Sequence, residues 1–190
     1  MHILCGGIIH HLVKFVHILV TQVELLQRMD GSVCLELPEG SPLAFARDMF
    51  MFSFYMRGMS FVDMAFLRKR DLRYGVVTYC RKKTNQCLTI EWEKPIQNIV
   101  DCYARQIKDT PFMLPILMKE DGTEYKRYRQ VEQNVNRNLK KIGDTIGLRI
   151  PLTTYVARHS WASIARNLDI SIAVISEGMG HNSYKTTQTY

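Results

Sequence analysis

The segment "PLAFARDMFMFSFYMRG", residues 42–58, constrains the fold more than any other part of the chain. Ser41 is a typical helix N-cap, Pro42 suits the first helical position, and Gly58 suits the end of a helix. Apolar side chains occupy nearly every face of this helix, so it has to be surrounded by other elements. The sequence therefore predicts one central helix with the rest of the domain packed around it.

Further helices and one small sheet are predicted around this centre. Ser60, with Asp63 three residues later, forms a capping box for a short helix. The segments "GVVTYC" and "CLTIEW" have the composition of strands and are joined by the polar turn "RKKTNQ". Four later segments are predicted to be helices from their apolar spacing and composition, and these are 95–108, 125–146, 153–168 and 171–180. The predicted fold class is α+β, mostly helical with a small antiparallel β-sheet.

Composition places the chain among ordinary globular proteins with a basic surface. Of 190 residues, 46% are hydrophobic and 23% charged, and the formal net charge is +7. Basic chains of this size often bind polyanions. The five cysteines are odd in number, and their irregular spacing contains no CxxC pair. We therefore expect no structural zinc site or disulfide framework, and reduced thiols in a cytosolic protein.

The first 20 residues are apolar but do not have the pattern of a signal peptide or membrane span. His10, His11, Lys14 and His17 interrupt the run, no basic region precedes it, and no small-residue cleavage site follows. We interpret residues 1–35 as an N-terminal extension of uncertain role, and no membrane partner is expected.

Basic residues gather in two parts of the sequence, with tyrosines between them. Such runs are usually solvated helix faces, but two together favour a surface that follows a phosphate backbone. The first cluster is Arg68, Lys69, Arg70, Arg73, Arg81, Lys82 and Lys83, and the second is Lys126, Arg127, Arg129, Arg137, Lys140, Lys141 and Arg149.

The end of the chain carries the most specific pattern. In "TTYVARHSWAS", Tyr155, Arg158 and His159 have the spacing i, i+3 and i+4, which puts them on one side of a helix. An arginine there can grip a phosphate with its bidentate fork. The next helix ends in "MGHNS", with His181 at a glycine turn, and Tyr190 follows nine residues later. Each part alone also fits a surface arginine, a packed histidine or a frayed tail.

The segments "ARHSWAS" and "MGHNSYKTTQTY" resemble the tyrosine recombinases, also called phage integrases, and the likeness covers residues 36–190. The resemblance implies that this range is a catalytic domain, with Tyr190 as nucleophile, Arg158 as a phosphate-binding arginine and His181 as the histidine of the third box. It also implies a catalytic lysine on the β-hairpin. Lys83, just before Thr84, is the first candidate, Lys82 is the alternative, and a merely solvated basic turn is the third interpretation.

Two family motifs differ in this chain. Aligning Asp63 with the family's acid puts Ser60 at the first arginine position, and Arg57 lies three residues earlier. Either Arg57 folds back across the turn to the same phosphate, which we favour, or Ser60 is only an N-cap and the first arginine is missing or supplied elsewhere. Tyr155 replaces the usual histidine of the second box.

The resemblance assigns supporting roles to four further residues. Tyr155, His159, Lys82 and Arg81 are expected to contact phosphate or DNA.

The resemblance implies a site-specific DNA recombinase of the mobile-element integrase subgroup. It would cut and rejoin double-stranded DNA through a 3′-phosphotyrosyl intermediate, without metal or cofactor. A homotetramer on DNA, a monomer alone and a location in the bacterial cytoplasm at the nucleoid are expected. The chain is expected to be a catalytic domain cut short at both ends, just after the nucleophile.

Three alternative functions remain open. They are a non-catalytic DNA-binding remnant, a type IB topoisomerase-like nicking and resealing activity, and a basic RNA-binding or scaffold protein.

Overall fold

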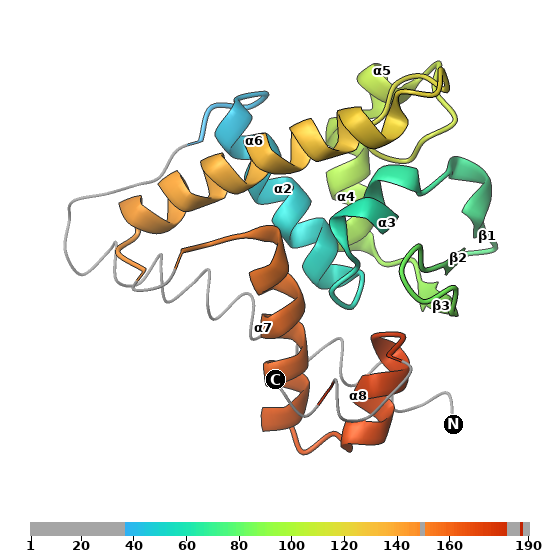
Figure 1. The fold of residues 1–190 in the computed structure, drawn as a ribbon, viewed down its shortest axis with the longest axis vertical. Coiled ribbons are helices and arrows are strands. Elements are labelled where there is room, and N and C mark those ends of the chain that lie inside the picture. The colour runs from blue at the N-terminus through green and yellow to red at the C-terminus, as the bar shows by residue number, and fades with distance from the viewer. Residues whose placement is uncertain (1–36, 149–150, 182–186, 188–190) are drawn as a thin grey trace.

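Helix α2, Pro42–Tyr55, lies at the centre of the molecule (Figure 1). The computed structural model describes residues 37–148, 151–181 and 187. Helix α2 packs against α6, Glu124–Thr145, against α7, Thr154–Asn167, and against α4, Lys94–Cys102. The Ser41 hydroxyl accepts a hydrogen bond from the Ala44 amide at 3.1 Å, so the predicted N-cap is confirmed. The predicted central position of this helix is confirmed as well.

The remaining helices are short. Helix α3, Phe61–Phe66, and the 3₁₀ turn η1, Lys69–Asp71, connect α2 to the sheet. Helix α5, Ala104–Ile107, follows α4 directly, so the single predicted helix over 95–108 is divided at Tyr103. Helix α8, Ile172–Gly178, lies beside α7 (Figure 1).

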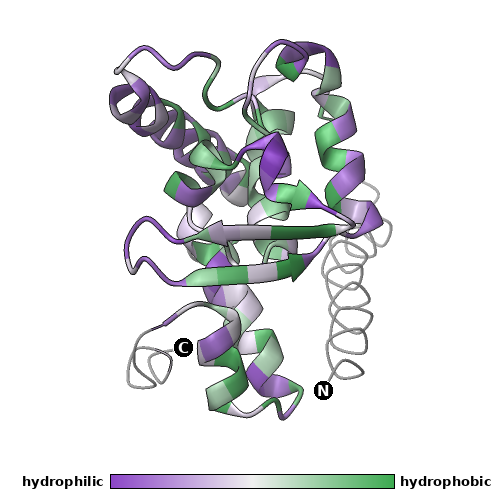
Figure 2. Cartoon of the chain, turned by 90° about the vertical axis from the view of Figure 1, so that its right-hand side faces the viewer, coloured by the Kyte–Doolittle hydropathy of each residue, from purple (hydrophilic) through white to green (hydrophobic). Residues whose placement is uncertain are grey.

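The sheet contains β1, Leu72–Arg73, β2, Val76–Cys80, and β3, Cys87–Glu91, in the antiparallel order β1-β2-β3. Side chains alternate between its two faces, and Figure 2 shows the corresponding change of hydropathy along the strands. The inward-facing residues are Val77, Tyr79, Leu88 and Ile90. The two predicted strands are confirmed. Strand β1 was missed because a two-residue strand within a basic run has no alternating pattern.

Two apolar cores hold the described part of the chain together. The larger surrounds α2 and includes Phe52, Leu114 and Leu139, whose side chains are fully buried. The smaller lies between α7 and α8 around Trp161 and Ile175, and Phe54 of α2 contributes to it. Helix α2 therefore connects the α7–α8 pair to the main body.

The cysteines correct one sequence-based expectation. Cys80 and Cys87 are opposite each other on β2 and β3 and form a disulfide, with a Cα–Cα distance of 3.9 Å. The prediction of reduced thiols is therefore wrong for this pair. The two cysteines flank the predicted turn, at the end of one predicted strand and the start of the next, and the antiparallel register places them opposite each other. Cys102 is free and exposed, whereas Cys5 and Cys34 lie outside the described residues.

The fold is α+β and mostly helical with one small antiparallel sheet, as the sequence predicts. None of the helices within the described ranges is long and apolar enough to cross a membrane. The predicted N-terminal extension, residues 1–35, lies outside those ranges.

Candidate active site

Arg158 is the centre of the site. It lies on α7 with only 6% of its surface exposed, and a buried guanidinium requires hydrogen-bond partners. Its Nη1 donates to the Gly58 carbonyl at 2.7 Å, and its Nη2 donates to the Met179 carbonyl at 2.7 Å. Nη2 also lies 2.8 Å from Nε2 of His181. One side chain thus joins the turn after α2, the turn after α8 and the third-box histidine.

His181 follows the glycine turn after α8 and is held on both ring nitrogens. Arginine can only donate, so Nε2 of His181 accepts from Arg158, and the ring proton is on Nδ1. Nδ1 lies 2.8 Å from Oγ1 of Thr187 and donates to it. Burial, and then the charges of Arg158, Arg81 and Lys83, lower the pKa of His181 to about 4. The imidazole is therefore neutral at pH 7.

Gly58 permits the close approach of Arg158. Its φ is +71°, a left-handed conformation that favours glycine. A Cβ atom at this position would lie 2.7 Å from Cα of Arg158. No other residue type fits without moving α7 away from the turn.

Arg57 precedes this glycine and also has a positive φ, of 55°. Its charge acts on Tyr79, a core residue of β2, together with the charges of Arg81 and Arg158. Burial and then Asp63 raise the pKa of Tyr79, and the three arginines oppose that rise. Arg57, Arg81 and Arg158 therefore converge on one region of the molecule.

Ser60 acts as a helix cap. Its hydroxyl accepts from the Asp63 amide at 3.4 Å and donates to Oδ2 of Asp63 at 2.6 Å. The other carboxylate oxygen of Asp63 accepts from the Lys82 amide at 2.8 Å, and Oδ2 lies 3.8 Å from Nε of Arg81. Asp63 is buried and thus connects the start of α3 to the β2–β3 hairpin.

Arg81 lies in the interior. It is 5% exposed and donates to the Gly180 carbonyl. The expectation that Arg81 contacts phosphate or DNA stays a prediction, and in the fold its side chain lies between the hairpin and the glycine turn.

The two candidate lysines are exposed in the hairpin turn but differ in surroundings. Nζ of Lys82 lies over the Phe66 ring, 4.6 Å from its centroid. Lys83 instead contributes to lowering the pKa of His181, which indicates that its charge lies toward the cluster. Of the two, Lys83 is the one electrostatically coupled to the site.

Tyr155 and His159 form a pair at the edge of α7, with ring centroids 4.4 Å apart in an edge-to-face arrangement. Tyr155 is 59% exposed, whereas Arg158 on the same helix is buried. Burial and then the charge of Arg158 lower the pKa of His159.

The two basic clusters are partly neutralised by acids. Arg68 pairs with Glu120, Arg127 with Asp121 at 2.8 Å, and Arg129 with Glu132 at 3.6 Å. The positive surface is therefore weaker than the number of basic residues suggests.

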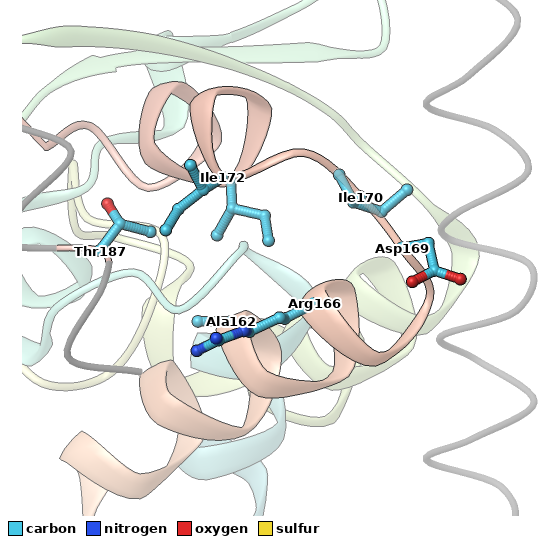
Figure 3. A pocket seen from close by; sticks show the side chains of 7 residues that line it. Ala162, Arg166, Asp169, Ile170, Ile172 and Thr187 are labelled. Carbon is cyan, nitrogen blue, oxygen red and sulfur yellow. The ribbon is translucent and has the colours of Figure 1, made fainter.

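A cavity of about 390 Å³ lies between α7 and the start of α8, with Thr187 on one wall (Figure 3). Its other walls include Ala162, Arg166, Ile170 and Ile175. Arg158 and His181 are not among the lining residues, so their cluster lies outside this cavity.

The structure thus brings Arg158, His181, Arg81 and Asp63 into one cluster, near Arg57 and Lys83. Tyr190, the expected nucleophile, lies outside the described residues. Thr187 was not predicted to be a site residue, because only the folded structure shows its contact with His181. In the described ranges, no three His, Cys, Asp or Glu residues are grouped as a metal site would require.

Comparisons with known proteins show the family to which the chain belongs. Residues 39–190 match the model of the phage integrase family. Tyrosine recombinase XerA of Pyrococcus furiosus is 28% identical over 138 residues, covering 72% of this chain and 46% of that protein. XerA of Saccharolobus solfataricus is 28% identical over 82 residues, covering 43% of this chain and 28% of that protein. The chain spans less than half the length of either relative.

Solved structures share the fold at low sequence identity. The XerH site-specific recombinase bound to its difH substrate has a TM-score of 0.59 at 15% identity, covering 80% of this chain and 44% of that chain. A lambda integrase (75-356) dimer bound to a COC′ core site has a TM-score of 0.56 at 15% identity, covering 80% of this chain and 53% of that chain. Because the family model matches most of the chain, the chain belongs to the phage integrase family.

Proposed function

We propose that residues 36–190 form the catalytic domain of a site-specific DNA recombinase that cuts and rejoins DNA through a 3′-phosphotyrosyl intermediate at Tyr190. The observation that carries the proposal is the contact between Arg158 and His181, two groups 23 residues apart whose nitrogens lie 2.8 Å from each other. The XerH and lambda integrase structures, solved with a difH substrate and a COC′ core site, support double-stranded DNA as the partner.

In the proposed reaction, the Tyr190 oxygen attacks a phosphorus atom of the DNA backbone. The phenol loses its proton to solvent, a bond forms between its oxygen and phosphorus, and the bond to the 5′-oxygen breaks. The leaving 5′-oxygen takes a proton from Lys83. A lysine ammonium has three N–H donors and can serve as the general acid of this step.

Cationic donors would stabilise the charge that develops on the non-bridging oxygens. Arg158 and Arg57 are the proposed donors, because both charges act on the same phenol, Tyr79. His181 adds a neutral imidazole beside Arg158. A 5′-hydroxyl from a second duplex then attacks the phosphotyrosine. Its oxygen forms a bond to phosphorus and gives its proton back to Lys83, while the bond to the Tyr190 oxygen breaks and the phenol regains a proton from solvent. The strands thus rejoin without an external energy source.

The position of Thr187 supports Tyr190 as the nucleophile. Thr187 contacts His181, and three peptide units separate Thr187 from Tyr190. Tyr190 is therefore close in sequence to the residue that contacts the His181 ring.

A nicked suicide substrate tests the proposal, because loss of a short 5′-hydroxyl fragment traps the covalent intermediate. We expect the chain to form an SDS-resistant DNA adduct and Tyr190→Phe to form none. Exposed Tyr74, at the far end of the sheet, provides the matched control Tyr74→Phe, which should retain the adduct. Binding of DNA without any adduct would instead favour the non-catalytic remnant. If an adduct forms, exchange between two marked duplexes separates a recombinase from a nicking and resealing enzyme.

A further inference from the structure

The proposed chemistry assigns no role to Arg81, a buried cation that was expected from the resemblance to contact phosphate or DNA. Its guanidinium lies between the β2–β3 hairpin and the turn after α8, with 5% of the residue exposed. A buried guanidinium is costly unless it is paired, so its partners indicate why it is there. Those partners are the Asp63 carboxylate, 3.8 Å from Nε, and the Gly180 carbonyl, which accepts from Nη1.

The carboxylate side of this connection is rigid. Asp63 accepts from the Ser60 hydroxyl at 2.6 Å and from the Lys82 amide at 2.8 Å. It is 4% exposed and lies in the first turn of α3. Asp63 therefore fixes the backbone of Lys82, the residue after Arg81, by a hydrogen bond, and it pairs with the Arg81 guanidinium only as an ion, at 3.8 Å from Nε.

The other side of the connection is the peptide unit between Gly180 and His181. Its carbonyl oxygen accepts from Arg81, and Oγ1 of Thr84 lies 3.5 Å from the same oxygen. Its N–H, which belongs to His181, donates to the Ser176 carbonyl at 2.9 Å. Both polar atoms of this peptide unit are thus fixed, and the histidine side chain begins directly after it.

Gly180 is required for the approach of Arg81. Its φ is +63°, and a Cβ atom there would lie 2.7 Å from Cδ of Arg81 and 3.1 Å from Cδ1 of Leu88. The turn packs directly on the arginine, and a side chain would separate them.

We propose that Arg81 is a positioning residue, which fixes the Gly180–His181 peptide unit and thereby holds the His181 imidazole against Arg158. This inference rests on the proposed function for its catalytic consequence. The polar contacts of the Arg81 side chain are with Gly180 and Asp63, so its proposed effect on catalysis is transmitted through His181. Its charge also contributes, after burial and Arg158, to lowering the pKa of His181.

The test compares Arg81→Met with Arg81→Lys by nitrogen-15 NMR of the His181 ring and by the rate of adduct formation. In the wild type we expect the Nδ1–H tautomer to dominate, as the contact with Arg158 requires. Arg81→Met should give a tautomer mixture and a His181 pKa higher by roughly one unit. Adduct formation should slow by about 10- to 100-fold, because the imidazole is displaced. Arg81→Lys keeps the charge and should restore part of the rate.

Arg105→Met, at an exposed position on α5, is the matched control and should leave both readouts unchanged. If Arg81→Met does not fold, the variants Arg81→Lys and Gly180→Ala replace it in the NMR experiment. Each of them should change the tautomer populations of the His181 ring. A wild-type tautomer, pKa and adduct rate in the folded variants would overturn the inference. If the wild type forms no adduct, the proposed function fails, while the NMR comparison still tests whether Arg81 positions His181.

Discussion

At the scale of single residues, the site depends on the number of hydrogen-bond partners that the Arg158 side chain contacts at once. Arg158 donates to the carbonyls of Gly58 and Met179 and contacts His181, all within 2.8 Å. Only a planar guanidinium with separate donors can reach these atoms together. The same geometry that anchors α7 therefore also fixes the direction of the cationic group.

Arg158→Lys should disrupt both anchoring and catalysis. An ammonium cannot bond both carbonyls, so a buried acceptor loses its partner, and the free energy of unfolding should fall by about 1–3 kcal/mol. The adduct rate should fall by about 10²- to 10³-fold. Urea denaturation and suicide-substrate kinetics measure the two effects. Arg166→Lys, at an exposed position in the last turn of the same helix, should change neither; equal effects at both positions would contradict the assignment.

The lowered pKa of His181 predicts that the free energy of unfolding decreases in acid. Its pKa is about 4 in the fold, against 6.5 for the ordinary group. Between these values the unfolded chain binds a proton that the folded chain does not, so unfolding becomes more favourable as the pH falls from about 6.5 to 4. Above this range the group contributes no pH dependence. Wild type and His181→Gln should differ in the slope of unfolding free energy against pH across this window, and identical slopes would argue against a buried neutral imidazole.

At the scale of elements, the site is built where α7, the turn after α2 and the turn after α8 meet. Two glycines allow these elements to pack closely. Gly58 and Gly180 have positive φ values, and a Cβ atom at either position would clash with a neighbouring arginine. The hairpin adds Arg81 and Lys83 from the other side.

Gly58→Ala tests the packing of α7 on its turn, with Gly40→Ala as the matched control. Both glycines have positive φ, of +71° and +74°, so both variants incur a conformational cost of about 1–2 kcal/mol. Only at Gly58 would the methyl also meet Cα of Arg158, at 2.7 Å. Gly58→Ala should therefore lose about 1–3 kcal/mol more in chemical denaturation. Equal losses would mean that the turn adjusts freely.

The Cys80–Cys87 disulfide should stabilise the hairpin that carries Lys83. The bridge closes a short loop, with a sequence separation of 7. Chain entropy for a loop of this size corresponds to about 2–3 kcal/mol. The double variant Cys80→Ser, Cys87→Ser should lose about that much stability, as should the reduced wild type. Cys102→Ser, at a free cysteine, should lose none, and a double variant as stable as the oxidised wild type would refute the prediction.

At the scale of the whole molecule, two apolar cores meet along α2, and the candidate site lies where the elements of both come together. Local signals in the sequence predicted the caps of α2 and α3, the strands β2 and β3, and the long helix α6. These features depend on residues close together in the chain.

Features that depend on distant contacts could not be predicted in the same way. Gly58 and Met179, the carbonyl partners of Arg158, lie 100 and 21 residues from it. The burial of Arg81 depends likewise on how the hairpin meets its neighbours. The Cys80–Cys87 bridge is a local contact by comparison, because it joins the two strands of one hairpin across its turn. The sequence motif predicted which polar residues form the site. Which of them contact one another, and at what distances, could be seen only in the folded structure.

The central claim is that Tyr190 forms a bond to a DNA phosphate next to Arg158 and His181. Mass spectrometry of the trapped adduct, after protease and nuclease digestion, tests it most directly. The predicted result is a peptide that carries a nucleotide 3′-phosphate on Tyr190, which disappears in Tyr190→Phe. A nucleotide on any other residue, or an undiminished adduct in Tyr190→Phe, would contradict the account.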